Sequence, residues 1–142
     1  EYTFMVFVTP VGPYFKKGIN PLSLKITSQF HRAAPKGIGN IKAIGNYSAS
    51  LYPLTEAKKE GFDEVIYLDA AREEIIEEVG SANFFIFQDG KIKTPSLSGS
   101  ILGGVTRDSV CLVAREILGI SVEETDISVS YTHLTLPTTP YV

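Results

Sequence analysis

The chain has 142 residues, of which 44% are hydrophobic and 20% charged, with a formal net charge of -3 at pH 7. This composition allows one domain with a folded core, argues against disorder, and gives no reason to expect nucleic acid or an anionic membrane as a partner. A single cysteine, Cys111, excludes a disulfide framework and a zinc knuckle, and no apolar run is long enough to cross a bilayer.

The first elements predicted along the chain are two strands joined by a turn-rich connection. Residues 2–8 form a near-continuous β-prone run that ends at Pro10, which is typical of a buried strand. Residues 12–21 collect turn formers and two lysines, and we interpret them as a connection between lobes. Residues 22–27 alternate apolar and polar side chains, as a half-exposed strand does. Because a strand begins at once and without an initiator methionine, we expect the true start of the protein upstream.

A helix is predicted over residues 48–60, after a glycine-rich, basic loop at 31–40. Gly61 is well placed to end this helix, and Pro53 is compatible only with its first turns. The side chains expected on one face of this helix are Leu51, Leu54 and Ala57.

The second half of the chain is predicted to contain further strands and one more helix. Residues 62–70 form a strand with a solid apolar block, and residues 73–95 give two strands joined by a type I′ turn at Asp89-Gly90. A helix follows at 106–118 and ends at Gly119; its expected inward side chains are Val110, Val113, Ala114 and Ile117. Strands that alternate with single helices indicate a mixed α/β domain.

Lys42 is an unusual lysine because its neighbours, "IKAI", are small or aliphatic. It could simply point outward from a strand whose other face is buried. Alternatively, its amine could lie in a dry pocket, where desolvation disfavours the charged form, lowers the pKa and makes the amine nucleophilic enough to form a Schiff base. The residues around it leave both interpretations open.

The stretch "SGSILGGVTRDS", residues 98–109, is a candidate anion site. Its glycine pair lets the backbone approach a ligand closely, and the free N–H groups of the following helix start attract an anion. It lacks the pattern of a nucleoside triphosphate loop, so a small phosphoryl group is the expected guest. The alternative is an ordinary helix start with Thr106 or Asp108 in its first turn.

The run "EEIIEEVGSANFF" contains a candidate buried carboxylate. Side chains of a strand alternate between its two faces, so one of Glu77 and Glu78 should point inward. A buried carboxylate needs a cationic partner, and a protonated pyridine nitrogen would serve. The alternative is a charge run on a solvated face.

A reactive lysine, a phosphate-sized anion site and an inward carboxylate are together what pyridoxal phosphate requires. The segments "FHRAAPKGIGNIKAIGNYSASL", "GFDEVIYLD", "EEVGSANFFIF" and "LGGVTRDSV" resemble, in order and spacing, the fold-type IV branched-chain amino acid aminotransferases. The resemblance runs from Glu1 to about Val129. It implies a mixed α/β fold: the last strand of a small N-terminal domain at 1–11, an interdomain loop at 12–21, and part of the large cofactor-binding domain at 22–129. Residues 130–142 stop resembling the family and are expected to be an artefactual tail.

The resemblance also implies a role for individual residues. Lys42 is similar to the lysine that forms the Schiff base and shuttles the proton, Tyr47 to the tyrosine that hydrogen-bonds the cofactor's phenolic oxygen, and Glu78 to the glutamate that pairs with the pyridinium nitrogen. Tyr14 falls at an aromatic residue of the loop that covers the substrate pocket. The remaining positions match the phosphate site, at Gly104, Val105 and Thr106, and the residues that sandwich the ring, Ser81 and Leu102. No metal site is implied.

The implied reaction is transamination between leucine, isoleucine or valine and 2-oxoglutarate by an intracellular, soluble homodimer. Within the same fold, D-amino-acid aminotransferases and aminodeoxychorismate lyases keep the lysine and the glutamate, but "GNY" and "EEVGSANFF" favour the branched-chain group. A different class of function remains open: a non-catalytic domain whose basic loop at 31–42 binds an anionic partner. The family's phosphate-binding arginine and its "GTA"-type carboxylate segment have no counterpart in this sequence.

Overall fold

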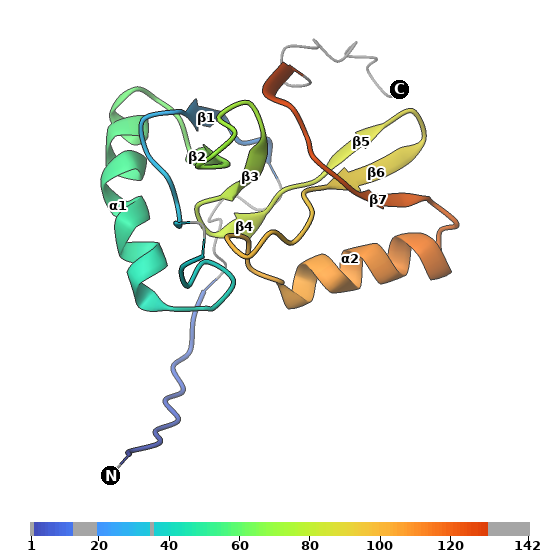
Figure 1. The fold of residues 1–142 in the computed structure, drawn as a ribbon. Coiled ribbons are helices and arrows are strands. Elements are labelled where there is room, and N and C mark those ends of the chain that lie inside the picture. The colour runs from blue at the N-terminus through green and yellow to red at the C-terminus, as the bar shows by residue number, and fades with distance from the viewer. Residues whose placement is uncertain (1, 13–19, 35, 131–142) are drawn as a thin grey trace.

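The structure is a computed structural model that describes residues 2–12, 20–34 and 36–130 (Figure 1). The described residues form two small sheets and two helices. In chain order the elements are β1 (Leu24–Thr27), α1 (Ile44–Lys59), β2 (Glu64–Leu68), β3 (Ile76–Val79), β4 (Ala82–Asn83), β5 (Ile86–Gln88), β6 (Lys91–Thr94), α2 (Val105–Glu116) and β7 (Val122–Glu124). This arrangement confirms the predicted mixed α/β class.

Each sheet contains one parallel pair of strands joined through a helix. In the first sheet, ordered β1-β2-β3-β4, strands β1 and β2 run parallel and α1 connects them. In the second sheet, ordered β5-β6-β7, strands β6 and β7 run parallel and α2 connects them. The remaining pairs are antiparallel. Parallel neighbours need such a crossover, so each helix lies beside its own sheet (Figure 1).

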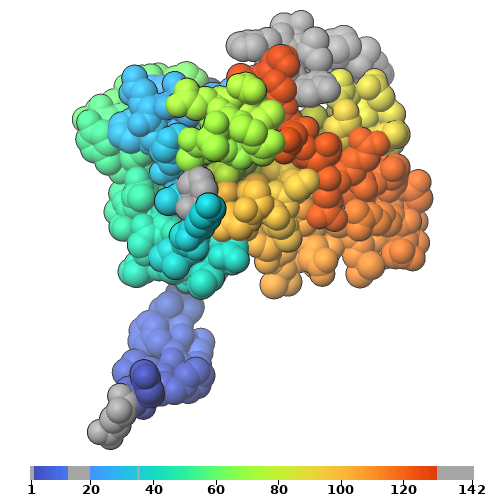
Figure 2. All heavy atoms as spheres, in the orientation of Figure 1, coloured from blue at the N-terminus to red at the C-terminus, as the bar shows by residue number. Residues whose placement is uncertain are grey.

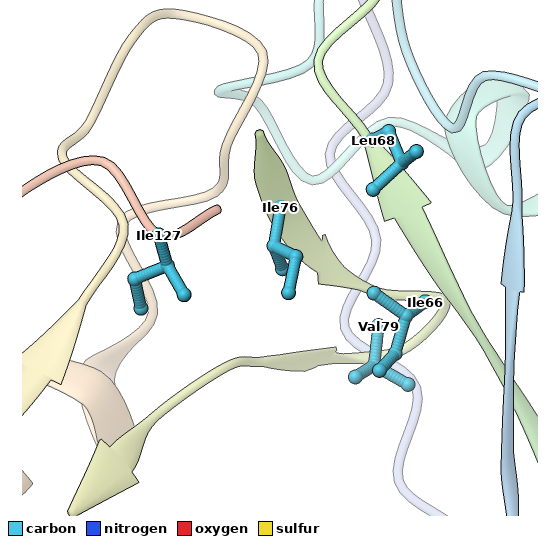
Figure 3. Close-up of a cluster of buried hydrophobic side chains, with 5 residues drawn as sticks. All are labelled: Ile66, Leu68, Ile76, Val79 and Ile127. Atoms are coloured by element: carbon cyan, nitrogen blue, oxygen red, sulfur yellow. The ribbon is translucent and has the colours of Figure 1, made fainter. Parts of the chain in front are cut away.

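The core lies on both faces of β2, which explains why its sequence is a solid apolar block. On one face, Ile66 and Leu68 pack with three more buried aliphatic side chains, Ile76, Val79 and Ile127 (Figure 3). On the other face, Val65 and Tyr67 pack with Ala57 of α1. Each buried aliphatic side chain contributes about 1.5–3 kcal/mol relative to its exposed state, so these two clusters hold β2 against β3 and α1.

The predicted turn chemistry is confirmed where glycine takes a positive φ. After α1, Gly61 has a φ of 91° and donates its N–H to the Lys58 carbonyl at 3.1 Å, while the Phe62 N–H reaches the Ala57 carbonyl at 3.0 Å. These two bonds are a Schellman motif, which satisfies the last carbonyls of the helix. Asp89 and Gly90 have φ values of 52° and 75°, as a type I′ turn requires.

Helix α1 differs from its prediction in its start and in its buried face. It begins at Ile44, four residues before the predicted position 48, so Pro53 lies in its interior and not in its first turns. The side chains buried on this helix are Asn46, Ser50, Pro53 and Ala57. Leu51 is exposed. Of the predicted face, Ala57 is buried as expected and Leu54 is half-buried, so the prediction is wrong only for Leu51. The buried face also includes polar side chains such as Asn46, which donates to the carbonyls of Ile38 and Ile41.

Helix α2 is also rotated relative to its prediction. The buried side chains are Arg107, Cys111 and Ala114, while Val110 and Val113 are exposed and Ile117 is 73% exposed. Only Ala114 of the predicted inward set is buried. The cause is Arg107, whose guanidinium donates to the Pro95 carbonyl and pairs with Glu124 at 2.8 Å, which turns its face of the helix toward β7. Periodicity alone misses such an anchor because arginine counts as polar.

The predicted strand at 2–8 is wrong for the described residues, which have no strand assignment from 2 to 12 and are exposed. Figure 2 shows this segment projecting away from the rest of the molecule. A strand needs a neighbour for its backbone N–H and C=O groups, and no described strand pairs with it. The region 73–95 holds four short strands instead of two. Most of the predicted interdomain loop, including Tyr14, and the tail 131–142 lie outside the described residues. None of the described helices is long and apolar enough to span a membrane.

Candidate active site

Both glutamates of the predicted pair are buried, each with 3% of its surface exposed. They are neighbours on β3, so their side chains leave opposite faces of the strand. The sequence predicted one inward carboxylate, whereas β3 is covered on both sides and holds two. Each must find partners inside the protein, because an unpaired buried charge is costly.

Glu78 has partners on both carboxylate oxygens. Its Oε1 pairs with the guanidinium of Arg32 and accepts the backbone N–H of Leu102 at 3.2 Å. Its Oε2 accepts the side-chain N–H of Asn83 at 3.2 Å. Burial is the largest influence and raises the pKa of Glu78 to about 7, with neighbouring Glu77 adding to the rise while Arg32 and the Leu102 N–H oppose it. This carboxyl group therefore changes its charge near neutral pH.

Glu77, on the opposite face, has a less complete set of partners. One oxygen accepts the hydroxyl of Ser100, and Oε2 has no hydrogen-bond partner among the described residues. Burial is also the largest cause here and raises the pKa of Glu77. The two carboxyl groups belong to one network, because Arg32 pairs with Glu78 and donates to the Ser100 carbonyl.

A small hollow on the Glu78 side brings four of the predicted site residues together. Its volume is about 30 Å³, room for about one water molecule. The predicted residues that line it are Tyr47, Glu78, Ser81 and Leu102, and the others are Arg32, Gly80, Ala82 and Asn83. A larger hollow of about 270 Å³ lies between β1 and α1 and contains none of the predicted residues.

The predicted anion site is the start of α2. Gly104 is the residue before the helix, and Val105 and Thr106 are its first two residues, both with exposed side chains. The first N–H groups of a helix have no partner within it and carry partial positive charge. A Cβ on Gly104 would overlap the side-chain oxygen of Asn83, which also lines the hollow. The start of α2 therefore lies against the wall of the Glu78 hollow.

Lys42 does not lie where the dry-pocket interpretation places it. It precedes α1 in a loop, its side chain is exposed, and it is absent from the described walls of the Glu78 hollow. The other interpretation, an outward-facing lysine of a strand, is right about exposure but wrong about the strand, because Lys42 has no strand assignment. The side-chain N–H groups of Asn46 bond the carbonyls of Ile38 and Ile41 at 2.8 and 3.0 Å, which holds the backbone in a turn. On the wall of the hollow the cation that pairs with Glu78 is Arg32.

Sequence reasoning missed two residues that contact Glu78, namely Arg32 and Asn83. Arg32 was interpreted only as one charge of an anion-binding loop, but its side chain is buried and also donates to the carbonyls of Gly39 and Ser100. The sequence did contain a signal for Arg32. A buried glutamate requires a cation beside it, the chain has few arginines, and Arg32 is followed by two alanines, which are common in buried segments. Asn83 gave no signal, because an asparagine in a strand region is unremarkable.

Comparison with known sequences agrees with the predicted resemblance. A family model described as amino-transferase class IV matches residues 1–133. Branched-chain-amino-acid aminotransferase 5 of Arabidopsis thaliana, a chloroplastic protein, is 48% identical over 129 residues, which are 91% of this chain and 31% of that relative. The probable branched-chain-amino-acid aminotransferase of Streptomyces coelicolor is 47% identical over 129 residues, which are 91% of this chain and 35% of that protein. The chain thus spans about a third of the length of these relatives.

Solved structures give the same result for the fold. The branched-chain aminotransferase of Thermoproteus uzoniensis, solved with norvaline, has a TM-score of 0.77 and 32% identity, and the match covers 87% of this chain and 40% of that one. The PLP-form of the Thermobaculum terrenum branched-chain amino acid aminotransferase has a TM-score of 0.73 and 31% identity, covering 82% of this chain and 37% of that one. By the match over residues 1–133 and by these relatives, the chain belongs to the class IV aminotransferases.

Proposed function

We propose that the complete protein containing this chain is a pyridoxal-phosphate-dependent transaminase of leucine, isoleucine and valine, with 2-oxoglutarate as the amino acceptor. The names of the relatives support the substrate class, and the T. terrenum neighbour in its PLP-form supports the cofactor. The observation that carries the proposal is a buried carboxylate, Glu78, in a hollow whose wall contacts the start of α2.

The donor set in this structure fits the cofactor at both ends. Glu78 offers Oε2, which among the described residues accepts only the Asn83 N–H and keeps lone-pair capacity for a ring N–H. The first N–H groups of α2, at Val105 and Thr106, suit a phosphate dianion. The hollow is smaller than a pyridine ring, so the ring would lie over its mouth or displace a lining side chain.

When bound, the cofactor supplies an electron sink for the carbanion formed at the substrate Cα. The chain's own residues bind and orient it. Glu78 would hold the ring nitrogen protonated, Tyr47 would donate to the phenolic oxygen, and Leu102 and Ser81 would contact the ring. Because burial raises the pKa of Glu78 to about 7, a cationic ring nitrogen beside it would favour its charged form.

Lys42 is the residue that we propose to attach the cofactor through its amine and to carry the proton between the reacting carbons. In this chain its side chain is exposed, so the role requires a rearrangement of the loop before α1 or cover from parts of the protein that the chain does not span. Tyr14, proposed to cover the substrate, lies outside the described residues. A homodimer in an intracellular compartment is the proposed state of the complete protein.

The test compares substrates and lysines in the complete protein. We expect transamination of L-leucine with 2-oxoglutarate and none of D-alanine; activity on D-alanine alone would replace the proposal by a D-amino-acid aminotransferase. We also expect Lys42→Ala to abolish turnover and Lys36→Ala, a lysine of the same loop, to leave it unchanged.

The anion-binding alternative is weakened because Arg32, one of the charges of its basic loop, is buried and paired. It would gain support if Lys36→Ala and Arg32→Ala abolished ligand binding while Lys42→Ala did not.

A further inference from the structure

Asn83 lies where the two proposed ends of the cofactor site meet. The residue is on β4, directly opposite Glu78 of β3 in the antiparallel pair, and it lines the same hollow. We propose that Asn83 is a positioning residue that fixes the carboxylate of Glu78 relative to the start of α2. The inference rests on the proposed function, because it gives Asn83 its role through the cofactor.

The first observation is that one amide group bonds both segments. The side-chain nitrogen of Asn83 donates to Oε2 of Glu78 at 3.2 Å and to the backbone carbonyl of Leu102 at 2.8 Å. A primary amide has two N–H donors, so these two bonds use the full donor capacity of the side chain. Leu102 is two residues before Gly104, and the Gly104 N–H bonds the Leu102 carbonyl at 2.9 Å.

The second observation is that the two oxygens of Glu78 accept different numbers of hydrogen bonds. Oε1 pairs with the Arg32 guanidinium and accepts the Leu102 N–H. Among the described residues, Oε2 accepts only the side-chain N–H of Asn83. A carboxylate oxygen can accept about two hydrogen bonds, so Oε2 is the oxygen with capacity for a ring nitrogen. Asn83 therefore sets the direction in which the open lone pair of Glu78 points.

The third observation is the contact between Asn83 and the residue before α2. The side-chain oxygen of Asn83 lies only 2.3 Å from the position that a Cβ of Gly104 would take, so glycine at position 104 allows the backbone to pack against this amide. The amide thus contacts the helix start with its oxygen and Glu78 with its nitrogen. Movement of Asn83 would displace both the ring-nitrogen acceptor and the amides proposed to bind phosphate.

The short hairpin explains how Asn83 itself is held. Glu78 pairs with Asn83 and Val79 with Ala82, and Gly80 and Ser81 make the turn between them. Directly opposed residues of an antiparallel pair have Cβ atoms about 5 Å apart, within reach of a side-chain hydrogen bond. The backbone thus brings the amide to the carboxylate without a mobile linker.

The experiment measures cofactor binding by the complete protein after its cofactor has been removed and in the absence of substrate. Dissociation constants for pyridoxal phosphate and for pyridoxal, which lacks the phosphate, are obtained by fluorescence titration of wild type, Asn83→Ala and Asn83→Asp. Gln29→Glu, which adds the same charge at an exposed side chain outside the proposed site, is the matched control. Thermal unfolding without cofactor reports the fold of each variant.

We expect Asn83→Ala to weaken pyridoxal phosphate binding roughly tenfold or more, the effect of losing hydrogen bonds to a charged group and to a carbonyl. The advantage of pyridoxal phosphate over pyridoxal should shrink as well, because the helix start loses its support. A purely structural role would lower the melting temperature without changing that ratio. Asn83→Asp should be at least as damaging because a second carboxylate beside Glu78 repels it, and Gln29→Glu should match wild type.

An unchanged ratio of the two dissociation constants in folded Asn83 variants would overturn the inference while leaving the proposed function intact. Wild-type protein that binds neither ligand would overturn both. If Asn83→Ala does not fold, the neutral variant Asn83→Ser, which also removes the amide, takes its place in the comparison.

Discussion

The buried ion pair between Arg32 and Glu78 permits a quantitative prediction for Arg32→Met. The two side chains are 3% and 5% exposed. Methionine retains much of the apolar volume of arginine but removes the charge, which leaves the Glu78 carboxylate buried without its cation. The carbonyl of Gly39, which accepts Arg32 at 3.0 Å, also loses its donor.

We expect Arg32→Met to lower the free energy of unfolding by about 3–5 kcal/mol, the cost of breaking a buried pair. The matched control is Lys25→Met, which breaks a pair with Glu60 whose side chains are 34% and 52% exposed. Surface pairs contribute about 0–1 kcal/mol, so the control should change little.

The assay is urea denaturation of both variants and of the double variant Arg32→Met/Glu78→Gln at pH 9, well above the pKa of about 7 of Glu78, so that Glu78 without Arg32 must stay charged or take up a proton at a cost. The double variant should be more stable than Arg32→Met alone, because the unpaired charge is gone. An Arg32→Met variant that loses no more than Lys25→Met would refute the reasoning, since the pair would then contribute no more than a surface pair.

Three further predictions concern charge and close packing. The pKa of Glu78 is raised from 4.5 to about 7, so between pH 4.5 and pH 7 the folded state binds this proton more tightly than the unfolded state does. The free energy of unfolding should therefore fall as the pH rises through this range, by roughly 3 kcal/mol. Urea denaturation at pH 5 and at pH 8 should show this pH dependence in wild type and its loss in Glu78→Gln. Gly39→Ala should lower the melting temperature by several degrees, because its Cβ would lie 2.5 Å from the Ser100 carbonyl oxygen; a melting temperature equal to that of wild type would contradict the packing. Gly104→Ala should weaken pyridoxal phosphate binding, measured by fluorescence titration, because its Cβ would overlap Asn83; equal affinity would contradict the proposed contact.

Local rules of backbone chemistry predicted much of the fold. The solid apolar block of β2, the Asp89-Gly90 turn and the end of α1 at Gly61 all follow from short-range preferences that the rest of the molecule does not oppose. The buried faces of the two helices could not be predicted fully from these preferences. In α2 the inward position belongs to Arg107, because a buried carbonyl and Glu124 accept its guanidinium. Periodicity ranks side chains by polarity and cannot detect such partners, which come from distant segments.

In the candidate site, too, some features could be predicted from local patterns and others could not. Alternation predicted a buried carboxylate near Glu78, and the glycine pair predicted an open helix start at Gly104. The partners of Glu78 could not be predicted, because Arg32 and Asn83 reach it from separate segments of the chain. The exposure of Lys42 was also beyond sequence reasoning, since it depends on the turn that Asn46 holds.

The central claim is that the amine of Lys42 is the group that attaches the cofactor. The most direct measurement treats the complete protein with pyridoxal phosphate and borohydride, and then locates the modified residue by peptide mass spectrometry. We predict a phosphopyridoxyl group on the peptide containing Lys42 and none in Lys42→Ala. Wild-type protein that is modified at Lys36 or another lysine while Lys42 stays unmodified would contradict the account, and so would wild-type protein with no modification.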